Sequence, residues 1–215
     1  MSPLLIKVIP LDLAAIISPV LFGLVIFLLG NKNHPKASTF TILLGALIVG
    51  IGITLAGFAL GNTTEKSANP SIWTAIIDII LGIIFIIYGI KALVKPHKKD
   101  HKIQQEGQKN NLLKLFFLGI LLCVFNDSFF LIFAASKEVG SSGIGNLNKL
   151  VFLIITIFCF TLPITIPLFI FIIFPKIAKP ILEKINLIVM KYSKFVIFAL
   201  FVIFGIYFIL KGIKA

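Results

Sequence analysis

The chain has 215 residues and a net charge of +12; 59% of its residues are hydrophobic and only 13% are charged. Soluble domains are about 45–50% apolar and about 25% charged, so this composition excludes an ordinary soluble protein and indicates a multi-pass membrane protein. The 20 basic residues are all lysines. They cluster in short segments between apolar stretches, as topology determinants at a membrane surface do, which argues against a nucleic-acid partner.

Six apolar stretches are long enough to span a bilayer, which takes about 20 helical residues. We therefore expect an all-α integral membrane protein with six transmembrane helices, at residues 8–29, 38–60, 71–93, 112–135, 150–174 and 195–212. Residues 94–111 form a basic linker, and no polar stretch is long enough for a second domain. In residues 175–194 lysines alternate with isoleucine and leucine at helical spacing, which predicts an amphipathic helix on the membrane surface.

Polar residues and prolines interrupt several of these spans. The fourth span carries Asn126, Asp127 and Ser128 near its middle, where a carboxylate facing lipid would be costly. Pro19 follows Ser18 in the first span and predicts a bend there, because proline removes a backbone donor. The fifth span holds two prolines and two threonines, and we expect the threonine hydroxyls to satisfy the carbonyls that the prolines leave free.

The second span is rich in small residues. Ala46, Gly50 and Thr54 recur every four positions, so they give one smooth helix face that allows a neighbouring helix to approach closely. This pattern predicts packing and not chemistry.

The lysines also predict the orientation in the membrane. Most of them fall in the first, third and fifth loops, whereas the other side holds Lys7, Lys66, Lys137, Lys211 and Lys214; Lys91, Lys114 and Lys149 at helix ends are set aside. Positive loops stay in the cytoplasm. We therefore expect a cell-membrane protein with loops 1, 3 and 5 cytoplasmic and both termini outside.

The ends of the third and sixth spans repeat each other. Residues 82–92 read GIIFIIYGIKA and residues 205–215 read GIYFILKGIKA. A looser correspondence places Ser18-Pro19 and Asn126-Asp127 at similar depths in the first and fourth spans. These matches predict two three-span repeats, residues 1–93 and 112–215, which insert with opposite orientation because three is odd. Inverted repeats with interrupted helices are typical of secondary transporters, whose substrate site lies near the midplane.

The order of these features resembles the GAP family, the glycolipid-addressing or Sap-type proteins of the LysE exporter superfamily. Ser18-Pro19 is similar to the family's first-span S-P, Asp78 and Gly82 to its third-span D and G, and Asn126 to its fourth-span N-P. The chain departs from the family at Asp127, where proline is usual, and at Asp12, which is not a family feature. The resemblance implies export of a small molecule or a lipid-linked glycan across the cell membrane.

The residues expected along a substrate or ion path between the first and fourth spans are Asp12, Ser18, Pro19, Asp78, Asn126, Asp127, Thr161, Pro163, Thr165 and Pro167. Asp12 and Asp78 are each either a proton-coupling carboxylate or a solvated residue at the membrane interface. No lysine is expected in the middle of a span, so Asp127 must be neutral, hydrated or bound by other donors.

Three alternatives to a transporter remain open on the sequence alone. A thiol–disulfide electron conduit would need a cysteine in each repeat, but Cys123 and Cys159 both lie in the second. A membrane-embedded enzyme is disfavoured because the three histidines fall in loops and no catalytic motif occurs, so we expect no enzymatic activity, metal or cofactor. A non-transporting accessory protein for lipid export is the third. The expected partners are the bilayer and a small-molecule or lipid substrate, and a homodimer is compatible with the sequence.

Overall fold

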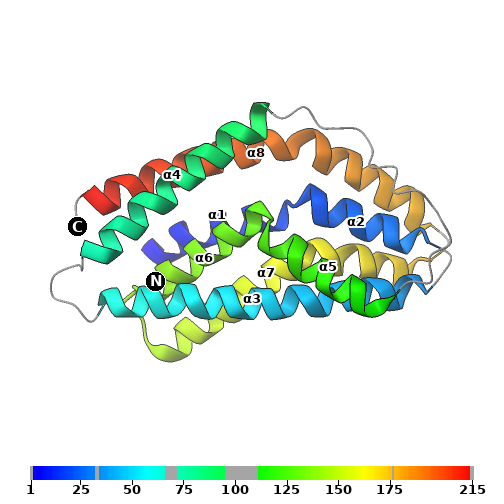
Figure 1. Ribbon diagram of the computed structural model, residues 1–215, viewed down its shortest axis with the longest axis horizontal. Helices are drawn as coiled ribbons and strands as arrows, with labels where there is room; N and C mark the ends of the chain where they lie inside the picture. Colours follow the sequence, from blue (N-terminus) through cyan, green and yellow to red (C-terminus); the bar gives the residue numbers. More distant parts are fainter. Residues whose placement is uncertain (1, 32–33, 66–71, 95–110, 176, 214–215) are drawn as a thin grey trace.

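The protein is a bundle of α-helices whose long axes run mostly in one direction (Figure 1). The computed structural model describes residues 2–31, 34–65, 72–94, 111–175 and 177–213, and all regular structure within these ranges is helical. The helices are α1 (Ser2–Ile16), α2 (Pro19–Leu29), α3 (Pro35–Glu65), α4 (Ile72–Val94), α5 (Leu112–Val124), α6 (Asp127–Gly140), α7 (Asn146–Ile173) and α8 (Ala178–Ile213).

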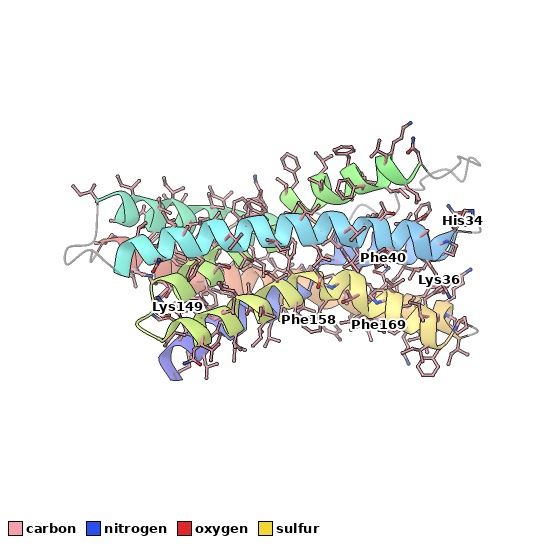
Figure 2. All side chains as sticks on the ribbon, turned by 90° about the horizontal axis from the view of Figure 1, so that it is seen from below. His34, Lys36, Phe40, Lys149, Phe158 and Phe169 are labelled. Carbon is pink, nitrogen blue, oxygen red and sulfur yellow. The ribbon has the colours of Figure 1, made fainter. Side chains whose placement is uncertain are left out.

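Four of the described stretches are long and apolar enough to cross a membrane: Leu4–Leu29, Pro35–Thr63, Asn146–Ile173 and Ala178–Ile213. The pair of α5 and α6, bent by 64° at the break between them, would make a fifth. Large apolar side chains point outward from these helices; Phe40, Phe158 and Phe169 are each more than half exposed (Figure 2). Such a surface suits a lipid environment. The third predicted span, residues 71–93, corresponds to α4, which has 23 residues; that α4 crosses the membrane stays a prediction.

The first span is broken where the sequence predicts a bend. α1 ends at Ile16 and α2 begins at Pro19. Proline suits the first position of a helix, because the amide hydrogen it lacks has no partner within the helix there. The side chain of Ser18 caps α2 by accepting a hydrogen bond from the Leu21 amide at 3.4 Å.

The fourth span is broken in the same way at Phe125 and Asn126. α5 ends at Val124, and Asn126 caps α6 by accepting a hydrogen bond from the Ser128 amide at 3.3 Å. The span also runs farther than the predicted end at residue 135, because α6 continues to Gly140.

The small residues of α3 do serve packing, as predicted. Ala46 and Thr54 are buried, and a Cβ added to Gly50 would lie 2.9 Å from the Phe160 ring on α7. A second row of glycines meets α5 and α6. A Cβ at Gly45 would lie 2.8 Å from the carbonyl oxygen of Phe116, and one at Gly57 would lie 2.5 Å from that of Phe133.

α4 and α8 lie side by side as a pair along one side of the bundle (Figure 1). Their contact includes the repeated segment, because a Cβ at Gly82 would lie 2.6 Å from the Gly205 carbonyl oxygen and one at Gly205 would lie 3.0 Å from that of Gly82. Ile86 and Ile209, four residues farther along each helix, complete this contact. Equivalent positions of the two sequence matches therefore pack against each other.

One predicted element is wrong. The amphipathic surface helix expected at residues 175–194 is not separate from the last span, because α8 is a single helix of 36 residues. At about 1.5 Å per residue it is roughly 54 Å long. That length exceeds a hydrocarbon core of about 30 Å, so part of α8 must extend beyond the lipid if it spans the membrane.

In the fifth span, the threonine hydroxyls do not bind the carbonyls that the prolines leave free. α7 keeps helical geometry through Pro163 and Pro167. Helical hydrogen bonding means that these prolines free the carbonyls of Cys159 and Pro163. The threonine hydroxyls donate elsewhere, Thr161 to the Phe158 carbonyl at 2.9 Å and Thr165 to the Thr161 carbonyl at 3.2 Å.

Candidate functional site

The two helix breaks meet inside the bundle and are joined by hydrogen bonds. Asn126 Nδ2 donates to Ser18 Oγ at 2.6 Å. Ser128 Oγ donates to the Ala15 carbonyl at 2.9 Å. That carbonyl is the one that Pro19 leaves without its helical donor, so the fourth span repairs the break in the first. We call Ser18, Asn126, Ser128 and the Ala15 carbonyl the helix-break junction.

Two helices begin at this junction. Ser18 is the N-cap of α2 and Asn126 is the N-cap of α6. The first amides of a helix carry partial positive charge, so the junction gathers two such ends. Asp127 is the first residue of α6 and is partly exposed, a position where a carboxylate is favoured by the helix dipole.

The junction lies near the outer surface of the bundle. Phe125, next to Asn126, is 75% exposed, and Val20, just after Pro19, is 61% exposed. Ser18 and Ser128 are buried, while Asn126 is partly exposed. Polar groups of the junction are thus only a residue or two from side chains that face outward.

Asp12 is buried on α1 with an incomplete set of partners. It is 3% exposed, and its Oδ2 accepts a hydrogen bond from Thr156 Oγ1 of α7 at 3.1 Å. Its other oxygen, Oδ1, is buried and has no hydrogen-bond partner. Asp12 is therefore not a solvated residue at the interface.

A group of buried and partly buried charges lies near the end of the bundle where α1 begins and α8 ends (Figure 1). Lys137 is 1% exposed and pairs with Asp78 of α4. Glu138, also buried, pairs with Lys211 of α8 and with Lys7 of α1, the latter at 3.4 Å. We call Lys7, Asp78, Lys137, Glu138 and Lys211 the terminal charge cluster.

Two further side chains complete this region. The Tyr207 hydroxyl donates to Glu138 Oε2 at 3.2 Å. Lys149 Nζ donates to the Gly140 carbonyl at 3.0 Å; Gly140 is the last residue of α6, where a cation is favoured. Figure 2 places Lys149 at the end of the molecule opposite to His34 and Lys36.

Sequence reasoning missed most of this cluster. It assigned Lys137 to a loop and expected no lysine in the middle of a span. Lys137 instead lies in the last turn of α6, where it pairs with Asp78. A signal was present: apolar residues resume at Val139, and Gly140 and Ser141 are typical of a helix end. A span that ends at residue 140 places Lys137 and Glu138 inside its last turn.

The other predicted residues are placed as follows. Thr161, Pro163 and Pro167 are buried on α7, and the hydroxyls of Thr161 and Thr165 donate to carbonyls within α7. Cys123 is buried and Cys159 is partly buried, and both are free thiols. Most of the predicted linker at 94–111, with His97 and His101, lies outside the described residues.

A comparison with protein families identifies the chain. Searches of curated proteins and of solved structures found no match. A family described as "Sap, sulfolipid-1-addressing protein" matches residues 8–214. This match confirms the Sap-type part of the expected resemblance, whereas membership of the LysE superfamily stays a prediction. Because the match covers nearly the whole chain, the protein belongs to the Sap, sulfolipid-1-addressing protein, family.

Proposed function

We propose that this protein is a secondary transporter that exports a lipid or lipid-linked glycan across the cell membrane, with its substrate site at the helix-break junction. The observation that carries the proposal is the hydrogen bond of 2.6 Å that joins the two breaks, from Asn126 to Ser18. Broken helices at membrane depth are tolerated only where protein or a watery cavity surrounds them. In transporters such breaks form the substrate site.

The position of the junction favours a substrate that enters from the lipid. Phe125 and Val20 expose apolar surface beside the polar groups of the junction. A lipid could place its chains along such a surface and its headgroup at the helix N-termini, which favour negative charge. The description of the family as sulfolipid-addressing supports a lipid over a small polar solute.

The test is transport by purified protein in lipid vesicles, with an NBD-labelled diacyl glycolipid as the probe and a membrane-impermeant quencher to report its sidedness. We expect wild-type protein to move the probe and Asn126→Ala and Ser18→Ala to lower the rate to that of empty vesicles. Asn111→Ala is the matched control. Asn111 caps α5 as Asn126 caps α6, accepting a hydrogen bond from the Leu113 amide at 3.1 Å, but it lies away from the junction.

Loss of either cap should cost stability of about 1 kcal/mol, so thermal melting in detergent should shift for both asparagine variants while transport falls for only one. Equal transport by Asn126→Ala and Asn111→Ala would contradict the site. An inactive wild type would instead favour the accessory role in lipid export.

The electron-conduit alternative gains no support from the cysteines. Cys123 lies on α5 and Cys159 on α7, both in the second predicted repeat, and neither is at the junction. Replacement of both by serine should leave transport of the probe unchanged.

A further inference from the structure

The oxygens of the Asp12 carboxyl group are unequally satisfied. Oδ2 has the Thr156 hydroxyl as a donor at 3.1 Å, and Oδ1 has no partner. The side chain lies within the stretch Leu4–Leu29, which is apolar enough to cross a membrane. An ionised carboxylate in such a place costs several kcal/mol unless donors or a cation satisfy both oxygens.

No charged group described around Asp12 supplies that compensation. α1 packs against α6, α7 and α8. The nearby charged and titratable groups of these helices are mostly paired elsewhere: Lys7 with Glu138, Lys137 with Asp78, Lys211 and Tyr207 with Glu138, and Lys149 with the Gly140 carbonyl. Asp127 lies at the junction, and the charged residues early in α8, from Lys179 to Lys194, belong to its other end.

The titratable group from α7 that interacts electrostatically with Asp12 is the Cys159 thiol. A thiol carries no positive charge in either protonation state, so it does not compensate an ionised carboxylate. Ca²⁺ or Mg²⁺ is a poor alternative, because these ions take six or more ligands, mostly oxygens. Moreover, the described residues contain no group of three His, Cys, Asp or Glu side chains that could hold a metal.

We infer that Asp12 is a proton-binding site, and that the proton it takes up and releases drives the proposed transport. In the closed arrangement seen here the neutral carboxyl group is the form that the surroundings tolerate. The ionised form requires water at Oδ1, which in turn requires α1 and α7 to separate. Proton release and the opening of this contact therefore favour each other, which is what coupling needs.

The location of Asp12 fits that role. It lies five residues after Lys7 of the terminal charge cluster and six residues before Ser18 of the junction. At about 1.5 Å per residue these separations are roughly 7.5 and 9 Å along the helix. A proton at Asp12 is thus between one end of the bundle and the proposed substrate site, on the helix whose break forms that site.

The first test detects the proton without any substrate. Infrared spectra of wild-type protein in lipid at neutral pH should show a carboxylic-acid carbonyl band that shifts when aspartate is labelled with ¹³C at its side-chain carboxyl carbon. The band should be missing from Asp12→Asn and unchanged in Glu183→Gln, whose side chain is exposed on α8. A band that persists in Asp12→Asn, or a labelled wild type without an acid band, would overturn the inference.

The second test measures coupling and rests on the proposed function. In vesicles with the NBD-labelled glycolipid, a pH gradient should accelerate transport by wild-type protein. Asp12→Asn, which mimics the protonated form, should still move the probe but lose the whole of that acceleration. A gradient effect that survives in Asp12→Asn overturns the coupling and leaves transport standing. If wild-type protein moves no probe at all, the proposed function fails, and the infrared result still decides whether Asp12 holds a proton.

Discussion

Lys137 and Glu138 show how two neighbouring residues can serve separate ion pairs. Adjacent side chains on a helix point about 100° apart, so Lys137 reaches Asp78 on α4 while Glu138 reaches Lys211 on α8 and Lys7 on α1. α6 is thereby tied to three helices within one turn. The burial of Lys137, at 1% exposure, makes its pairing obligatory, because an unpaired buried charge is strongly destabilising.

We therefore expect Lys137→Met to lower the free energy of unfolding by about 3–5 kcal/mol, since it leaves the Asp78 carboxylate buried without its partner. The double variant Lys137→Met with Asp78→Leu should recover most of this loss, because it removes both charges. Thermal melting of the single and double variants in detergent measures the difference. Additive losses in the double variant would show that the two side chains do not stabilise one another.

Glu138 accepts from three donors, two of which are partly exposed: the side chains of Lys7 and Lys211 are 40% and 31% exposed. Solvent weakens such interactions, so we expect Glu138→Gln to cost less than Lys137→Met, about 1.5–3 kcal/mol. Glu183→Gln, on the exposed side of α8, is the matched control and should not change the melting temperature. Equal melting temperatures for the two glutamine variants would rule out a stabilising role for Glu138.

The sequence was informative about single residues where local chemistry decides their role. Proline at position 19 favours a helix break, and the polar run at Asn126 favours a helix N-cap, so both interruptions were predictable. The meeting of Asn126 with Ser18 was suggested by their similar depth in the two predicted repeats. The pairing of Asp78 with Lys137 spans 59 positions in the sequence and depends on how α4 and α6 pack, which no local pattern encodes.

At the scale of helices, glycine controls how closely α3 approaches α6. A Cβ at Gly57 would lie 2.5 Å from the Phe133 carbonyl oxygen, whereas one at Gly52 would meet nothing within 4 Å. Both glycines lie in the same helix, so their helix propensities are comparable and only their surroundings differ.

Gly57→Ala should therefore destabilise the protein by about 1–3 kcal/mol, because the backbones of α3 and α6 must move apart. Gly52→Ala should be neutral or stabilising by about 0.5–1 kcal/mol, because alanine loses less chain entropy in a helix. Melting temperatures of the two variants, measured side by side, check this prediction. A stabilising Gly57→Ala would mean that the close contact between α3 and α6 is absent in the membrane.

The helical nature of the spans followed from their apolar length, and the two breaks followed from Pro19 and from the polar run at Asn126. The ends of the helices could not be predicted in this way. The lysines of residues 175–194 suggested a separate amphipathic helix, yet α8 continues through them. Nothing in that segment interrupts a helix after Pro180, since lysine, isoleucine and leucine all accept helical geometry. A change in the polarity of a helix surface marks where lipid ends and not where the helix ends.

For the whole molecule, the contact between α4 and α8 joins equivalent positions of the two sequence matches, while the inverted repeat itself stays a prediction. Gly82 and Gly205 touch, and the rings of Phe85 and Phe208, three residues later in each helix, lie 5.7 Å apart edge to face. Contacts between equivalent residues of two antiparallel segments are expected on a two-fold axis. Such an axis, if it holds for the other helices, relates the break in the first span to the break in the fourth.

The distribution of lysines in space also sharpens the predicted orientation. Of the five lysines counted on the side of the termini, Lys7, Lys137 and Lys211 are used in ion pairs with buried acids. They therefore contribute little free positive charge at that end. The opposite end, where α3 begins, keeps exposed lysines such as Lys36 among the described residues.

Because lysine-rich loops stay in the cytoplasm, the end with Lys36 should be inside and the end with the start of α7 outside. In a cysteine-free background, Lys36→Cys should resist a membrane-impermeant thiol reagent applied to intact cells, and Leu147→Cys, at a residue that is 76% exposed, should react. Lysis should make both reactive, which controls for burial. Labelling of Lys36→Cys alone in intact cells would show that the orientation is the reverse of the predicted one. The terminal charge cluster would then face the cytoplasm, and Asp12 would take up its proton from that side.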